Sequence, residues 1–220
     1  MMQILRAPKI DLKTLIKIQE KIVWQVRRRD GLKKLRRIAG CDISFARRNI
    51  AYAACVVLDY RTLEVLEKKV VKVKLRFPYI PTFLAFRELE GMLLAVKEME
   101  ADVYVVGAQG LAHPRRAGLA CHLGVVLDKP VIGVAKSILV GKAAVPANRR
   151  GAQTPIKEKG EIIGAAVRSN AGSKPVYVSI GNKISLKTAV KISIDTTRGH
   201  RLPEPLQKAH ELATEAARRL

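Results

Sequence analysis

Apolar residues recur every three or four positions over residues 10–28, while Lys13, Lys17 and Lys21 fall on the opposite side of that pattern. This spacing predicts an amphipathic helix that packs one apolar stripe against a core. A basic run follows, and Gly31 interrupts the helical pattern. The chain is therefore expected to start with a helix whose outer face carries lysines.

Three strand-like segments come next. Residues 37–46 and 49–60 are mostly apolar, whereas residues 70–77 alternate valine or leucine with lysine or arginine. Strict alternation predicts a strand with one buried face and one solvent-exposed face. The short, turn-prone link after Asp59 predicts a hairpin, so the three segments together should form an antiparallel meander.

Helical spacing returns after Pro81, and Thr82 is the expected N-cap of that helix. The pattern of residues 102–137 then predicts a strand, a helix and a second strand, which together form a unit with two parallel strands. Residues 161–167 and 175–180 add two further strand candidates.

The last segment, residues 202–220, predicts a helix entered through prolines. No repeat or linker interrupts the chain, so one domain over residues 1–220 is expected. The order of elements predicts an α/β protein with a ribonuclease-H-like fold. Its mixed sheet would consist of the antiparallel meander followed by parallel strands, and helices would flank it.

Composition narrows the class of protein. The chain has 220 residues, of which 48% are hydrophobic, enough for a sizeable core. No apolar run reaches the roughly 18 residues that span a bilayer, and the first residues lack a secretion signal, so a cytoplasmic location is expected. Cys41, Cys55 and Cys121 are far apart in the sequence and outside any metal-ligand pattern, which predicts reduced thiols.

Charge is the strongest compositional signal. Lysine and arginine number 41 against 19 acidic residues, a formal charge of +22. This excess favours a polyanionic partner, because cations that neutralise phosphates release counterions. Nucleic acid is favoured over a membrane surface, since no basic stretch also forms a lone amphipathic helix with aromatic anchors.

Four residues stand out as candidates for chemistry. Asp42 lies within an apolar strand, where a charge needs a cation or hydrogen-bond partners. Glu88 and His210 lie on predicted helices. Taken alone, Glu88 is expected on the surface, and His210 is equally consistent with a core residue or a ligand. Tyr79 lies between Pro78 and Pro81, which stiffen the loop, so Tyr79 either packs into the core or wedges between bases.

Six stretches together resemble the endonuclease V family, which nicks nucleic acid near deaminated adenine, that is, inosine. They are FPYIPTFLAFRE (77–88), AQGLAHPRRAGLACHLG (108–124), GVAKS (133–137), IIGAAVR (162–168), VYVSIGN (176–182) and RLPEPLQKAH (201–210). The resemblance covers residues 10 to 216 and implies the ribonuclease-H-like fold that the element order also predicts. It further implies a Mg²⁺-dependent enzyme, with Mn²⁺ as the alternative ion, that acts on inosine-containing DNA, RNA being the other open substrate. A monomer is expected.

The resemblance also implies roles for individual residues. Asp42, Glu88 and His210 match metal ligands, and Lys136 matches a lysine near the scissile phosphate. The wedge loop and the pocket for a flipped-out base match Pro78, Tyr79, Ile80, Pro81, Leu84, Gly110, His113 and Gly118. In such a pocket, glycines let backbone amides reach the base edge.

One position departs from the family pattern. Where the family has Asp-Gly-Gln-Gly, this chain has Gly107-Ala108-Gln109-Gly110, so the third metal carboxylate is missing and Ala108 adds a methyl group. Asp102 and Glu90 lie too far along their elements to replace it, and the position of Asp195 is open. Two functions therefore remain open: a repair endonuclease that hydrolyses a phosphodiester bond 3′ of deoxyinosine, or an inosine-binding protein with weak or no cleavage.

Overall fold

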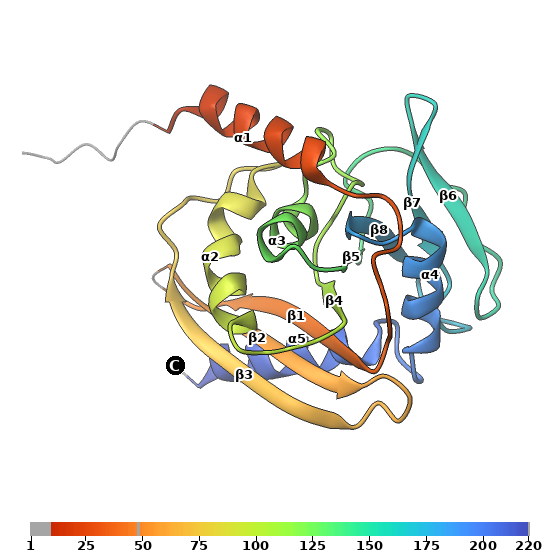
Figure 1. Ribbon diagram of the computed structural model, residues 1–220. Helices are drawn as coiled ribbons and strands as arrows, with labels where there is room; N and C mark the ends of the chain where they lie inside the picture. The colour runs from red at the N-terminus through yellow and green to blue at the C-terminus, as the bar shows by residue number, and fades with distance from the viewer. Residues whose placement is uncertain (1–9, 48, 220) are drawn as a thin grey trace, which may run out of the picture.

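A computed structural model describes residues 10–47 and 49–219, and an eight-stranded mixed sheet forms its centre (Figure 1). The first residues, where no secretion signal is predicted, lie outside this range. The strands are β1 (Arg37–Phe45), β2 (Ile50–Asp59), β3 (Val65–Lys74), β4 (Val103–Val106), β5 (Val131–Ala135), β6 (Gln153–Glu158), β7 (Glu161–Val167) and β8 (Val176–Asn182). The helices are α1 (Leu12–Gln25), α2 (Leu84–Val96), α3 (Leu119–Leu127), α4 (Leu186–Asp195) and α5 (Glu204–Arg218).

The strands are ordered β3-β2-β1-β4-β5-β8-β7-β6 across the sheet. The predicted meander is confirmed, because β1 pairs with β2 and β2 with β3 in antiparallel register. The predicted parallel unit is also confirmed, since β4 lies parallel to both β1 and β5. The later strands were expected to be parallel, and this is wrong: β5, β8, β7 and β6 pair antiparallel in turn. The α/β class with a mixed sheet and flanking helices is confirmed.

Several local expectations also need correction. The sequence patterns missed β6 and α4, and β3 begins at Val65 rather than near residue 70. Thr82 does not cap α2: Phe83 holds the N-cap position without a side-chain cap, and Thr82 has a left-handed backbone with φ of +69°.

Helices cover both faces of the sheet. Ala85 and Met92 of α2 pack with the β1 residues Ala39 and Cys41 on one face, and α5 crosses the other (Figure 1). Gly40 allows this crossing, because a Cβ atom there would lie 1.9 Å from the backbone oxygen of Pro205 at the start of α5. The close approach holds α5 directly against the strand that carries Asp42.

The three cysteines are buried, and none is in a disulfide bond. Across β1 and β2, the Sγ atoms of Cys41 and Cys55 lie 3.8 Å apart. In the described part of the chain, no helix combines the length and the apolar character that a membrane crossing requires.

A buried histidine should make stability depend on pH. His122 of α3 is 2% exposed, its Nε2 atom lacks a hydrogen-bond partner, and its ring meets Phe86 edge-on. Burial lowers the pKa of His122 from 6.5 to about 4. Between these two pKa values the unfolded chain binds a proton at His122 and the folded chain does not. The free energy of unfolding should therefore fall as pH drops from about 6.5 towards 4, by at most about 3 kcal/mol.

Thermal unfolding measured between pH 7 and pH 4.5 tests this expectation. His122→Leu should unfold at a higher temperature than the parent at pH 7, because it removes an unpartnered polar atom, and should lose part of the pH dependence. Burial also lowers the pKa of His113 to about 4, so the variant should keep part of the dependence of its melting temperature on pH. Identical pH slopes for parent and variant would contradict the role of His122.

Candidate functional site

The candidate site lies where two parallel strands end beside a third. Gly107 directly follows β4 and Lys136 directly follows β5, whereas Asp42 lies within β1, which continues to Phe45. The register aligns Cys41 with Val106 and Val106 with Gly133, so Asp42 lies level with the ends of β4 and β5. A pocket of about 400 Å³ at this edge is lined by Asp42, Gly107, Lys136 and His210. The fold thus brings together residues that are up to 168 positions apart.

Asp42 and His210 contact each other directly. The Nδ1 atom of His210, on α5, lies 2.6 Å from Oδ2 of Asp42. The Asp42 side chain is 14% exposed, whereas that of His210 is 37% exposed. Because α5 crosses the face on which Asp42 stands, His210 reaches the pocket, and its partly exposed side chain does not lie in the core.

Glu88 lies near this pair but does not line the pocket. It is 4% exposed on α2, so the surface position expected for a lone helical glutamate is wrong. Burial, reinforced by the negative charge of Asp42, raises the pKa of Glu88 to about 8, and Arg87 opposes the shift. The carboxyl group is therefore mostly protonated at neutral pH.

Gly107 leaves a space that the Asp42 carboxylate fills. A Cβ atom built on Gly107 would lie 2.2 Å from Oδ1 of Asp42 and 3.0 Å from its Cγ. Any other residue at position 107 would have to push the Asp42 carboxylate aside. The glycine at position 107, where the family has an aspartate, therefore also determines where the Asp42 carboxylate lies.

The arrangement does not fit a magnesium centre. Mg²⁺ needs oxygen ligands in near-octahedral geometry. Here one carboxylate is bonded to an imidazole, a second is buried and does not line the pocket, and a glycine supplies no side-chain ligand. Across residues 10–47 and 49–219, no three His, Cys, Asp or Glu side chains converge closely enough to hold a metal ion.

No nearby acid replaces the missing carboxylate. Asp195 is bound elsewhere: it accepts a hydrogen bond from the Tyr60 hydroxyl at 3.1 Å and pairs with Lys191. The sequence left the position of Asp195 open, and the structure places it outside the lining of the pocket. Asp102 accepts hydrogen bonds from the backbone of the segment leading into β1, and Glu90 is exposed on α2.

A second, smaller cavity adjoins the first. It measures about 100 Å³, below the roughly 300–1,000 Å³ of typical ligand pockets. Its lining contains most of the residues predicted for a base pocket, namely Tyr79, Ile80, Pro81, Leu84, His113 and Gly118. Pro78 and Gly110 are not among them: Gly110 packs against β8, and its amide donates to Ser179 Oγ at 2.9 Å. Leu84, Ala108, Gln109 and Leu139 line both cavities.

Tyr79 projects from a loop that is held at both ends. Its side chain is 69% exposed, which excludes packing into the core. At the start of the loop, Arg87 Nη1 donates to the Phe77 carbonyl at 2.6 Å. At its end, His113 Nε2 lies 2.9 Å from the Thr82 carbonyl oxygen. Tyr79 is thus an exposed aromatic ring on a stiff support.

The polar atoms of the small cavity have defined roles. Burial lowers the pKa of His113 to about 4, so its ring is neutral. Since Nε2 faces a carbonyl, Nε2 carries the proton and Nδ1 accepts from the Arg115 amide at 3.2 Å. Gln109 donates to the Ser137 carbonyl at 2.8 Å, while its Oε1 atom is buried without a partner. Gln109 therefore offers an unused acceptor, which motif matching did not reveal.

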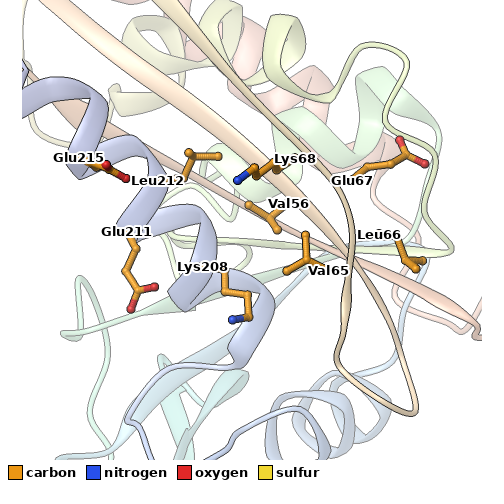
Figure 2. A pocket seen from close by; sticks show the side chains of 9 residues that line it. All are labelled: Val56, Val65, Leu66, Glu67, Lys68, Lys208, Glu211, Leu212 and Glu215. Carbon is orange, nitrogen blue, oxygen red and sulfur yellow. The ribbon is translucent and has the colours of Figure 1, made fainter.

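Figure 2 shows a separate groove of about 470 Å³ where α5 passes β2 and β3. Its lining consists of Val56, Val65, Leu66, Glu67, Lys68, Lys208, Glu211, Leu212 and Glu215. None of these is a predicted site residue. Three glutamates make the groove unsuited to phosphate, so the candidate site remains the strand-end pocket and its neighbour.

Comparison with known proteins gives a consistent result. The endonuclease V family pattern matches residues 20–211. Endonuclease V of Thermofilum pendens is 45% identical over 99% of this chain and 94% of the relative. The structure of Streptomyces avermitilis endonuclease V superposes with a TM-score of 0.89 at 32% identity, covering 97% of this chain and 96% of that one. Endonuclease V of Ciona intestinalis, solved with DNA containing an inosine, gives 0.83 at 29% identity, covering 94% and 98%.

Proposed function

The chain belongs to the endonuclease V family, and from that premise we propose that it recognises deoxyinosine in DNA as a repair endonuclease. The observation that carries the proposal is the adjacency of two cavities. One is small and lies behind an exposed tyrosine, and the other contains Asp42, His210 and Lys136. A base turned out of the helix could enter the first while its backbone lies across the second.

The chemistry of the lesion supports this assignment. Deamination replaces the bare N1 of adenine with an N1–H donor, so a selective pocket needs an acceptor. The unpartnered Oε1 of Gln109 is available for that role. The cavity must widen to admit a whole base, and two of the side chains that line it, Tyr79 and Leu139, are exposed.

Cleavage depends on a metal ion, and one observation favours the second candidate function. Hydrolysis 3′ of the lesion with Mg²⁺ or Mn²⁺ is the family expectation, yet in the described part of the chain no three His, Cys, Asp or Glu side chains converge on a metal position. The alternative is an inosine-binding protein that cuts weakly or not at all. Lys136 is exposed beside the pocket and would attract a phosphate in either case.

A two-part experiment tests the proposal. Binding is measured on a duplex with one deoxyinosine and on a matched adenine duplex, and nicking of both is measured with Mg²⁺. Preference for the deoxyinosine duplex is the expected result, and equal affinity for both would overturn the proposal. Ribo-inosine in the same sequence context tests RNA as a substrate.

Tyr79→Ala should weaken binding to the deoxyinosine duplex by about tenfold and binding to the adenine duplex much less. An inserted ring repays part of the unstacking cost only where a base has left the stack. Fluorescence anisotropy with both duplexes measures the two affinities. Because Tyr79 is mostly solvent-exposed, the melting temperature should stay unchanged. An equal loss on both duplexes would argue against the wedge.

A further inference from the structure

Thr82 joins the Tyr79 loop to α2 in an unfavourable backbone conformation. Its φ of +69° lies in the left-handed region. Residues other than glycine rarely adopt this region, and a β-branched residue does so only when its surroundings hold it there. Thr82 also lines the small cavity, so its conformation shapes that cavity directly.

Three side chains from two distant segments hold Thr82 in place. The Thr82 carbonyl accepts from Gln19 Nε2 at 2.8 Å, from His113 Nε2 at 2.9 Å and from Arg115 Nη2 at 3.3 Å. The Thr82 hydroxyl accepts from Arg115 Nη2 at 2.6 Å. These contacts form a clamp, here defined as Gln19, Thr82, His113 and Arg115.

Gln19 and Arg115 also support each other within the clamp. Gln19 is fully buried on α1, and its Oε1 atom accepts from Arg115 Nε. The Arg115 guanidinium lies 4.6 Å from the centre of the Phe83 ring, next to Thr82 in the chain. Both polar ends of the Gln19 amide are therefore used, and losing either would leave a buried group unpaired.

We propose that Gln19 and Arg115 are positioning residues that hold Thr82 in its left-handed conformation and thereby set the preference for deoxyinosine. The proposal rests on the function proposed above and assigns to α1, which lies outside both cavities, a part in lesion recognition. A stiff loop loses little entropy when Tyr79 inserts, whereas a released loop must be ordered on every binding event. The clamp thus acts on discrimination rather than on general affinity for DNA.

Gln19→Leu tests the clamp, with Gln25→Leu as the matched control. Gln25 lies on the same helix, is exposed, and bonds only to the carbonyl of Lys21 in its own helix. Gln19→Leu should lower the ratio of affinities for deoxyinosine and adenine duplexes by about tenfold, and Gln25→Leu should leave it unchanged. Thr82→Asn combined with Gln19→Leu should restore most of the ratio, because asparagine tolerates the left-handed region and keeps an acceptor for Arg115.

Hydrogen–deuterium exchange of residues 77–83 in the free protein gives a readout that does not depend on inosine. Exchange should rise in Gln19→Leu and return towards the parent level in the double variant. Unchanged exchange in Gln19→Leu, or an equal loss of affinity on both duplexes without rescue, would overturn the clamp. A parent protein that shows no deoxyinosine preference would overturn the proposed function instead, while the exchange data would still decide whether the clamp holds the loop.

Discussion

Gly107→Asp is expected to raise the rate of Mg²⁺-dependent nicking at deoxyinosine on the order of a hundredfold. The added carboxylate would supply the missing anionic ligand and, through its Cβ atom, push the Asp42 carboxylate out of the space it now fills. The atoms that must move belong to the Asp42 carboxylate, whose other oxygen contacts His210 Nδ1. Metal-assisted hydrolysis gains several kcal/mol from a well-placed ion, at about 1.4 kcal/mol per tenfold in rate. Single-turnover nicking of a duplex with one deoxyinosine measures the effect.

Gly107→Asn is the matched control for this prediction. It introduces the same Cβ atom and nearly the same volume but no charge, so it separates displacement of Asp42 from restoration of the ligand. Ala108 lines both cavities, and Gly107→Asp combined with Ala108→Gly should therefore exceed the single variant. Full activity of the unmodified chain at ordinary Mg²⁺ concentration would contradict the account. Equal activation by asparagine and aspartate would show that the position of Asp42, rather than charge, limits the rate.

Hydrophobic periodicity predicted the part of the fold that builds the site. Apolar runs and one alternating segment were sufficient for α1, the meander and the parallel unit. The hydrophobic pattern did not predict β6, because its sequence, QTPIKE, is polar and contains Pro155, a residue that strands accommodate mainly at the edge of a sheet. α4 is short and contains β-branched residues, so it resembled neither a strong helix nor a clear strand. The antiparallel direction of β8 depends on how the chain returns to the sheet, which periodicity does not encode.

Only those residues of the candidate site that match the family could be predicted from the sequence. The family resemblance implied a common site for Asp42, Glu88, Lys136 and His210, and the structure places all of these except Glu88 in the lining of one pocket. The clamp had no such signal, because a single glutamine inside a helix is unremarkable and its partner Thr82 lies 63 positions away. The effect of Gly107 on Asp42 likewise depends on atoms that meet only when β1 and β4 lie side by side.

Affinity for duplex DNA should fall about a thousandfold or more between about 50 and 200 mM salt. The formal charge of +22 leaves many more cations than the acidic residues can pair. Each neutralised phosphate releases counterions, and about six to ten such contacts give a loss of this size. Because phosphate contacts are independent of sequence, the deoxyinosine and adenine duplexes should share nearly the same salt slope. Anisotropy titrations at four or more salt concentrations measure both slopes.

Lys136→Gln provides the local test of this electrostatic account. If the exposed lysine beside the strand-end pocket neutralises one phosphate, the variant should reduce the salt slope by about one and weaken binding to both duplexes alike. Lys187→Gln is the matched control, since Lys187 is exposed on α4 and lines neither cavity of the site. An affinity that barely changes with salt would show that shape and stacking, rather than charge, hold the DNA. Equal effects of the two lysine variants would show that the positive surface acts as a whole and that no single phosphate is held at the pocket.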